Sequence, residues 1–370
     1  MGMLSIAQVM LIVWVTGRYA TAGVVAASGA VLFAIVTPRI ARLADRFGQA
    51  AVLRPLAVVF AVTSAAFMAA AVTHAPTLAV IVTGAVSRAT MPALGPMVRS
   101  RWSELLSGTD ALDSAFSLEG IADEVIFIAA PVLVVALVTG VHPVSGMLAT
   151  LLLSIAGVAG LTRHRSSEPA VSAQRGSGGA RRSGTVLVNP GLRVLIGVQV
   201  CLGALFAAVD IATIAFAQEH GARALAGPLL GLYGLGSAIA GVWYGAHHWR
   251  VSQRARLRAA LVATGFGVAP LAFMPGVAAL AAGIFVAGLG ISATLVSSYS
   301  IAERVVAAGR RTEGMSWLTT AASTGTAIGS SLAGHLVDAH GASAGYLLAL
   351  ASGLAAVAIL VIRYRDLGRS

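Results

Sequence analysis

The stretch Leu43-Ala44-Asp45-Arg46-Phe47-Gly48 is a short charged turn that ends in glycine. It stands between two apolar runs, Tyr19 to Ile40 and Val52 to Val72, and each run is long enough to cross a lipid bilayer as a helix. The turn therefore predicts a chain that passes through a membrane more than once.

The composition supports this interpretation along the whole chain. Of 370 residues, 57% are hydrophobic and only 11% are charged, whereas about 25% of a soluble globular domain is charged. Apolar runs recur between Arg-rich or Gly- and Pro-containing turns, so we expect an all-α integral membrane protein with twelve spans. The expected spans are Met3 to Thr16, Tyr19 to Ile40, Val52 to Val72, Thr77 to Val98, Asp113 to Val141, Val144 to Leu161, Leu192 to Gln218, Ala224 to His247, Ala259 to Met274, Val277 to Ser300, Gly314 to Val337 and Ala344 to Ile362.

The first expected span, Met3 to Thr16, is the shortest. As a helix it would rise only about 21 Å, whereas the hydrocarbon core of a bilayer is about 30 Å thick. A signal peptide is the rival interpretation, but no Lys or Arg precedes the run and no small-residue cleavage site obviously ends it. We expect that the first helix is truncated and that the native start codon lies upstream of Met1.

The positive charges are unevenly distributed among the expected loops. All 25 are arginines, and all but Arg18, Arg88 and Arg223 lie in or beside loops that follow even-numbered spans. The positive-inside rule makes these loops cytoplasmic and places the C-terminus in the cytoplasm. The net charge of +11 thus sets the topology, and we expect no nucleic-acid partner.

Between residues 163 and 190 the composition changes to Ser, Gly, Arg and Ala, which is typical of a flexible linker. We expect this cytoplasmic linker to separate a six-helix bundle over residues 1–162 from a second over residues 191–370. At an offset of 204 residues, Ala22-Gly23 matches Ala226-Gly227, which favours related halves with pseudo-two-fold symmetry. Parallel halves of this kind place a substrate site between them, alternately open to each side.

The turn after the second span resembles the signature of the major facilitator superfamily. In that family a Gly-x-Leu-Ala-Asp-Arg-x-Gly-Arg-like segment joins helices two and three. Leu43 to Arg46 and Gly48 match the segment in type and spacing, whereas Ala41 and Gln49 depart from it.

Other segments resemble the same family. Arg88 occupies a place similar to the family's membrane-embedded arginine, and Ala130-Pro131 looks like a degenerate form of its Gly-Pro antiporter signature. Segments such as Glu313-Gly314 resemble bacterial members from high-GC genomes. The resemblance implies a monomeric transporter of the bacterial plasma (inner) membrane rather than an enzyme. Its partners would be a small-molecule substrate, protons and the lipid bilayer, with no cofactor and no metal.

The resemblance assigns a conformational switch to Asp45, Arg46 and Gly48, in which Asp45 acts against the start of helix eleven near Gly314. A carboxylate beside a helix N-terminus interacts favourably with its unpaired N–H groups, by about 0.3 to 1 kcal/mol when exposed. The alternative is a solvated hairpin that only fixes topology. In the second half Trp249 stands at the position equivalent to Asp45, so the sequence predicts a switch in the N-terminal half alone.

Arg88 and Asp210 each lie well inside an expected span, the fourth and the seventh. An ionisable residue in the membrane is costly unless it is paired or faces water, so function is its default interpretation. Arg88 is suited to an anionic substrate group or to tuning a nearby acid; the alternative is a structural ion pair. Asp210 is suited to proton coupling or contact with a cation; the alternatives are a hydrogen bond between helices and exposure in the outer vestibule.

Three acidic residues of the fifth span are further candidates for binding a proton or a cation. Glu119 and Asp123 are four residues apart and share a helix face, whereas Glu124 points about 100° away from Asp123. The alternative is that all three are solvated and line the cytoplasmic opening of the protein. Glu124, the deepest, is the favoured candidate.

Hydroxyl and aromatic side chains collect in the tenth and eleventh spans. From these we take Tyr299, Trp317 and Thr320 as candidate pocket residues. The alternative is that the hydroxyl groups form hydrogen bonds between helices, as Ser and Thr often do in membranes.

The sequence as a whole predicts a secondary active transporter that works by alternating access. Proton-coupled efflux of small amphiphilic compounds is the preferred activity, because the central spans are mostly apolar. Uptake of a small polar metabolite by symport is the nearest alternative, and it would require more charged or amide side chains. A non-transporting scaffold or truncated remnant is another, which the short first span and degenerate motifs favour.

Overall fold

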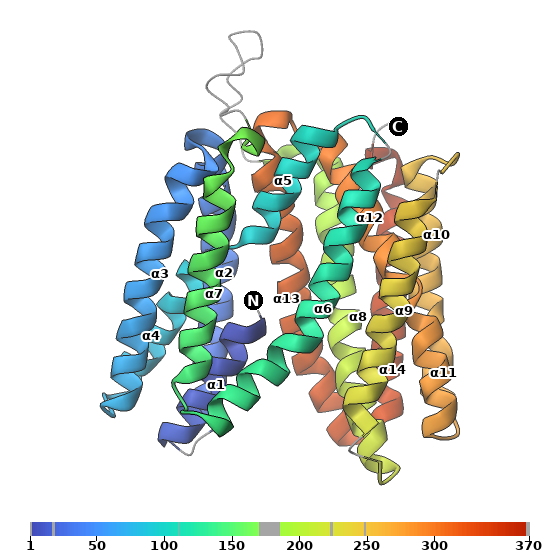
Figure 1. Cartoon of the computed structure of the whole chain (residues 1–370). Coiled ribbons are helices and arrows are strands. Elements are labelled where there is room, and N and C mark those ends of the chain that lie inside the picture. Colours follow the sequence, from blue (N-terminus) through green and yellow to red (C-terminus); the bar gives the residue numbers. More distant parts are fainter. Residues whose placement is uncertain are drawn as a thin grey trace. The chain divides into compact units, whose positions relative to one another are not determined.

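The computed structural model describes residues 2–16, 19–109, 111–169, 186–222, 225–247 and 249–367, and every regular element in these residues is a helix (Figure 1). Apolar runs of this length form helices because a backbone inside lipid has to satisfy its N–H and C=O groups within its own segment. The prediction of an all-α membrane protein is confirmed.

The chain divides into two compact units. Unit 1 comprises Met1–Leu105, Val125–Arg181 and Gly309–Ser316, and unit 2 comprises Leu106–Glu124, Arg182–Ala308 and Trp317–Ser370. Two long helices contribute to both units. Helix α6 (Ala111–Gly140) begins in unit 2, and α13 (Arg311–His340) begins in unit 1.

The other helices each lie wholly or almost wholly in one unit. Unit 1 contains α1 (Gly2–Thr16), α2 (Tyr19–Phe47), α3 (Gln49–Val72), α4 (Thr77–Thr90), α5 (Leu94–Leu106), α7 (Ser145–Arg163) and the short 3-10 turn η1 (Arg165–Ser167). Unit 2 contains η2 (Val186–Val188), α8 (Pro190–Glu219), α9 (Ala226–Ala246), α10 (Gln253–Gly267), η4 (Ala269–Phe273), α11 (Val277–Gly288), α12 (Ile291–Val305), α14 (Ala342–Ile362) and η6 (Tyr364–Leu367).

Within the described residues, nine helical stretches are long and apolar enough to cross a membrane. One of these, Thr77–Leu106, contains both α4 and α5, and another, Val277–Val305, contains α11 and α12. The break between α4 and α5 falls at Met91-Pro92-Ala93, where the proline lacks an N–H and disfavours a helical residue before it. Helix α1 is short, as the sequence predicts. Most of the predicted linker over residues 163–190 lies outside the described residues.

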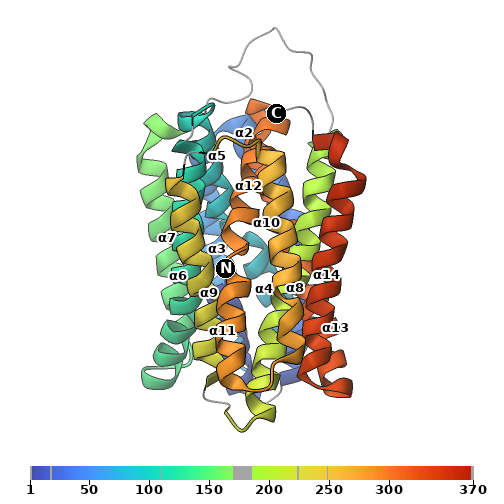
Figure 2. The same ribbon diagram turned by 90° about the vertical axis from the view of Figure 1, so that its right-hand side faces the viewer.

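Helix α8 supplies many of the buried core residues of unit 2. It packs against α14, which lies beside it in Figure 2, and it approaches α13 at glycines. A Cβ atom at Gly325 would lie 1.9 Å from the carbonyl oxygen of Val200, and one at Gly329 would lie 2.5 Å from the Cα atom of Ala204. Only glycine therefore fits at these two positions, and the backbones come as close as small-residue contacts in membranes allow.

In each unit the arginines gather at one end of the helices, which we call the Arg-rich end of that unit. These ends carry Arg39, Arg42, Arg46, Arg54, Arg99, Arg101 and Arg163 in unit 1, and Arg193, Arg254, Arg256, Arg258, Arg304, Arg363 and Arg365 in unit 2.

Candidate functional site

The turn after α2 is formed by Gly48, as its position in the sequence suggests. The helix ends at Phe47, Gly48 has a φ of 94°, and α3 begins at Gln49. This left-handed backbone conformation favours glycine, because any Cβ atom would be strained there. The turn sets Asp45 at the end of α2, where its side chain faces the first turn of α13.

Asp45 caps α13 from a different helix. Its Oδ1 accepts a hydrogen bond from the backbone N–H of Thr312 at 3.2 Å, and its Oδ2 accepts one from that of Glu313 at 2.8 Å. These N–H groups belong to the first turn of α13, where a helix cannot satisfy its own donors. A carboxylate at this point also interacts favourably with the helix dipole.

Glu313 adds charge pairs beside this cap. Its Oε1 accepts from Arg42 Nη2 at 2.8 Å, and its Oε2 accepts from Arg310 at 2.8 and 3.1 Å. The Glu313 side chain is fully buried, whereas that of Arg42 is 50% exposed.

Hydroxyl and amide groups complete the contact in unit 1. Thr312 Oγ1 lies 2.9 Å from Ser100 Oγ, and Gln49 Nε2 donates to the same oxygen at 2.8 Å. We call the six residues concerned the α13 cluster. Its members are Arg42, Asp45, Gln49, Ser100, Thr312 and Glu313.

A second polar cluster lies in unit 2, at the start of α6. Asp113 Oδ2 accepts from Arg256 Nη1 at 2.7 Å, and its Oδ1 accepts from Ser300 Oγ at 2.5 Å and from Gln253 Nε2 at 3.0 Å. The side chains of Arg256 and Asp113 are only 8% and 13% exposed. We call Asp113, Gln253, Arg256 and Ser300 the α6 cluster.

The two clusters occupy corresponding positions in the two halves of the chain. Asp113 and Glu313 are each the third residue of a helix of 30 residues. Gln49 and Gln253 are each the first residue of their helix. Each cluster also includes one serine, from α5 in unit 1 and from α12 in unit 2.

A polar contact at the start of a long helix is therefore present in both units, and the switch role of Asp45 stays a prediction. Trp249 does not replace Asp45; it donates from Nε1 to the Tyr244 carbonyl at 3.0 Å, and the acid in unit 2 is supplied by Asp113. The sequence analysis did not select Asp113, Gln253 or Arg256. The signal that would have found them is the spacing of 200 residues between Asp113 and Glu313, close to the repeat offset of 204.

Arg46 takes no part in the cap. It is exposed, and its guanidinium group lies 5.0 Å from the centre of the Phe47 ring. Of the three residues predicted to form the switch, the structure thus brings Asp45 into contact with α13, while Gly48 shapes the turn.

Arg88 lies in the last turn of α4 and is partly buried. Its Nη1 donates to Ser5 Oγ, and its guanidinium group lies 5.9 Å from the centre of the Phe33 ring. The Nε atom is buried without a hydrogen-bond partner, and no carboxylate of the described residues pairs with the side chain. A Cβ atom at Gly29 would lie 2.9 Å from Arg88 Cδ, so the glycine makes room for the side chain. A desolvated guanidinium group without a counter-ion is suited to an anionic group.

No described contact joins Arg88 to any of the predicted acidic residues. Asp210 is partly buried on α8, between the buried residues Val209 and Ala212. On α6, Glu119 is partly buried and Asp123 is exposed. The side chain of Glu124 lies outside the described residues.

The three predicted pocket residues are in unit 2. Tyr299 is partly buried and its ring centre lies 6.1 Å from that of Phe116. On α13, Trp317 Nε1 and Thr320 Oγ1 are buried without a hydrogen-bond partner among the described residues. Such groups are costly unless a ligand or water satisfies them.

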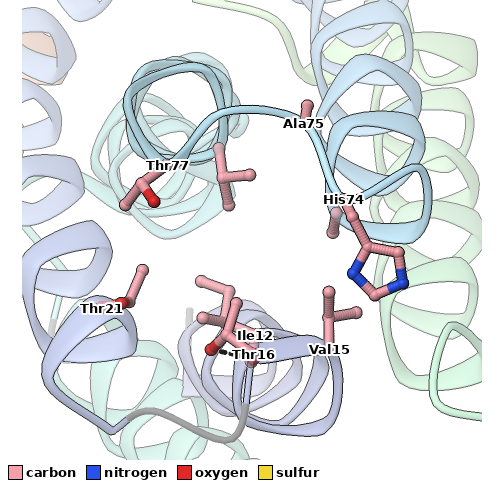
Figure 3. Close-up of a pocket in the computed structure, with 9 residues that line it drawn as sticks. Ile12, Val15, Thr16, Thr21, His74, Ala75 and Thr77 are labelled. Atoms are coloured by element: carbon pink, nitrogen blue, oxygen red, sulfur yellow. Dashed lines mark hydrogen bonds between the residues drawn. The ribbon is translucent and has the colours of Figure 1, made fainter.

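A cavity of about 160 Å³ lies in unit 1, at the end opposite the Arg-rich end. Figure 3 shows Thr21 and Thr77 on one side of it and His74 on the other, with Ile12 and Val15 beneath. None of the predicted site residues lines this cavity.

Comparisons with known proteins agree with the all-helical fold. Residues 200–369 match the family model described as Major Facilitator Superfamily. No curated protein matches the chain by sequence. Among solved structures, the chain is similar to the fucose:proton symporter of E. coli, with a TM-score of 0.73 and 14% identity over 100% of this chain and 96% of that one.

Two further solved structures have similar folds. One is a human organic anion transporter, with a TM-score of 0.70 and 14% identity over 95% of this chain and 84% of that one. The other is a bacterial homologue of the iron transporter ferroportin, with a TM-score of 0.69 and 14% identity over 98% and 97%. At such identities the likeness establishes the fold, which by itself does not specify a substrate.

Proposed function

We propose that the chain, whose residues 200–369 match the family model of the major facilitator superfamily, is a transporter of that family. It exports small amphiphilic compounds in exchange for protons by alternating access. It is a transporter rather than an enzyme. The Arg-rich end of each unit faces the cytoplasm of a bacterial cell, and the protein acts as a monomer in the inner membrane.

The observation that carries this proposal is the pair of clusters at the Arg-rich ends of the two units. Each attaches the start of a long helix to the unit in which that helix begins, and the helix ends in the other unit. The attachments consist of hydrogen bonds and ion pairs, which break and re-form without covalent change. Hydrogen bonds of this kind contribute about 0.5 to 3 kcal/mol each, and exposed ion pairs contribute about 0 to 1 kcal/mol. The binding of a substrate or a proton can shift an equilibrium between two conformations whose free energies differ by this amount.

The substrate is contacted by few polar groups. Within unit 2 we assign Trp317 and Thr320 to hydrogen bonds with the compound. Their unsatisfied donors support this assignment, because a buried donor without an acceptor gains most from a ligand. The scarcity of other charged side chains favours an amphiphilic compound over a highly polar one.

Asp210 is the proposed coupling acid. It is a partly buried carboxyl group on α8, among apolar residues of the core of unit 2. A group in such a place is suited to bind and release a proton during transport.

The test is transport by the purified protein in proteoliposomes, with a pH gradient of either sign. Export requires that substrate move against the direction of proton flow, and Asp210→Asn should abolish the dependence on the gradient while substrate exchange persists. Asp338→Asn, at an exposed carboxylate on α13, is the matched control. Movement of the substrate in the same direction as the protons would show symport and would contradict export. Unchanged coupling in Asp210→Asn would reject Asp210 as the coupling acid.

A further inference from the structure

Two arginines of α10 share one tyrosine ring on the surface of unit 2. The guanidinium carbons of Arg254 and Arg258 lie 5.3 Å and 5.7 Å from the centre of the Tyr364 ring. Arg254 is partly buried and Arg258 is exposed. This site belongs to the Arg-rich end of unit 2 but to neither polar cluster.

No described residue balances the charge at this site. Among the described residues, neither Arg254 nor Arg258 pairs with a carboxylate, and the Nε atom of Arg254 is buried without a hydrogen-bond partner. The nearest acid in sequence to Tyr364 is Asp366, which already accepts from Arg363 at 2.6 Å. Two cations around one ring repel each other, so an external anion would bind favourably between them.

The surface that continues from these arginines is apolar. Steps of four residues along α10 lead from Arg254 and Arg258 to Val262 and Phe266, which form one ridge of the helix. Val262 is 37% exposed and Phe266 is 55% exposed. A ridge with cations at one end and exposed apolar side chains beyond them matches an amphiphile in shape and polarity.

Helix α14 supplies the second wall of this surface. It packs against α10, and a Cβ atom at Gly265 would lie 3.3 Å from the backbone of Gly353. On α14, Leu354 is 40% exposed and Val361 is 57% exposed. The apolar ridge of α10 therefore runs beside a second apolar helix that ends next to Tyr364.

We propose that Arg254, Arg258 and Tyr364 bind the phosphate group of an anionic phospholipid, whose acyl chain lies along Val262 and Phe266. The planar guanidinium group is suited to phosphate, because its N–H donors match the phosphate oxygens in pairs. Basic side chains beside membrane helices attract anionic headgroups. A zwitterionic lipid fits less well, because its ammonium group would add a third cation to the site.

The proposal is tested on the full-length protein purified in detergent and stripped of lipid. Phosphatidylglycerol and phosphatidylcholine with the same acyl chains are titrated, and binding is followed by thermal shift and by native mass spectrometry. We expect tighter binding of phosphatidylglycerol. The double variant Arg254→Gln/Arg258→Gln should bind it about 30-fold more weakly, as the loss of two headgroup contacts predicts.

Two controls separate the site from general charge effects. The double variant Arg39→Gln/Arg304→Gln removes the same charge from exposed arginines elsewhere and should bind phosphatidylglycerol like the unmodified protein. Tyr364→Leu should weaken binding, whereas Tyr364→Phe, which keeps the ring, should not. These single changes also test the site if the double arginine variant does not fold.

Three results would overturn the proposal. Equal affinity for the two lipids would show that the arginines do not select an anionic headgroup. Undiminished binding in both the double arginine variant and Tyr364→Leu would place the lipid elsewhere. Glycerol 3-phosphate, which lacks acyl chains, should stabilise the protein much less than the lipid does. Equal stabilisation would show that the site binds the phosphate group alone and that the acyl chain contributes nothing.

Discussion

The α13 cluster and the α6 cluster occupy equivalent positions but hold their helices by different physical means. In unit 1, Asp45 caps the backbone of α13, and the ion pair beside it includes Arg42, which is 50% exposed. In unit 2 no residue of the α6 cluster caps the helix; instead Asp113 forms an ion pair with Arg256 in which both side chains are nearly buried. The recognisable sequence motif therefore marks the more exposed of the two ion pairs.

This difference has an energetic consequence. Removing one partner of a buried ion pair costs about 3 to 5 kcal/mol, because it leaves a charge without a counter-ion. Removing a helix cap costs about 0.5 to 2 kcal/mol. The start of α6 should thus be more sensitive to substitution than the start of α13.

The largest effect is expected for Asp113→Ala. The change leaves Arg256 buried without its counter-ion and removes the acceptor of Gln253 and Ser300. We expect the first turns of α6 to lose protection from hydrogen exchange, by an amount that approaches the full cost of about 3 to 5 kcal/mol, while the first turn of α13 stays protected. Hydrogen–deuterium exchange with mass spectrometry measures both segments in one sample. Protection of α6 equal to that in Asp338→Ala would contradict the role of Asp113.

An intermediate effect is expected for Asp45→Asn. The amide keeps one oxygen for the N–H groups of Thr312 and Glu313 but loses the negative charge that favours the helix N-terminus. Protection in the first turn of α13 should fall roughly 2- to 30-fold, with α6 unchanged. Hydrogen–deuterium exchange with mass spectrometry measures this loss of protection, and Asp338→Asn on the same helix is the control. A fall in α6 instead of α13 would mean that the two contacts are not separate.

The smallest effect is expected for Arg42→Gln. Its ion pair with Glu313 is half exposed, and such pairs contribute about 0 to 1 kcal/mol. Protection of α13 should fall by at most roughly fivefold, and the difference should disappear in about 1 M salt, which screens exposed charges. A salt-independent loss would show that this pair acts like the buried one in unit 2.

Much of the fold could be predicted from the sequence because its signals are local. The length and polarity of the apolar runs predict membrane helices directly, and the charged turn from Leu43 to Gly48 predicts a reversal of the chain. Arg88 could be selected for a similar reason, since a charge inside an apolar run is visible without knowledge of its surroundings.

The α6 cluster could not be predicted in this way, because its members are far apart in the sequence. Asp113 binds residues 140, 143 and 187 positions away. An acid at the start of a helix is common, and nothing near Asp113 indicates a buried arginine partner. The repeat offset places Trp249 opposite Asp45, whereas the acid of the α6 cluster, Asp113, corresponds to Glu313.

The most direct test of the central claim, that both clusters are released during transport, is the reactivity of a buried cysteine. Cys201 is the only cysteine, so Cys201→Ser combined with Thr320→Cys gives a single thiol at a candidate pocket residue. We would measure its modification by a membrane-impermeant reagent added from the Arg-rich side. The rate should rise in Asp45→Asn, rise in Asp113→Asn and be highest with both substitutions, while Asp338→Asn leaves it unchanged. A rate that rises in Asp45→Asn but stays constant in Asp113→Asn would contradict the account.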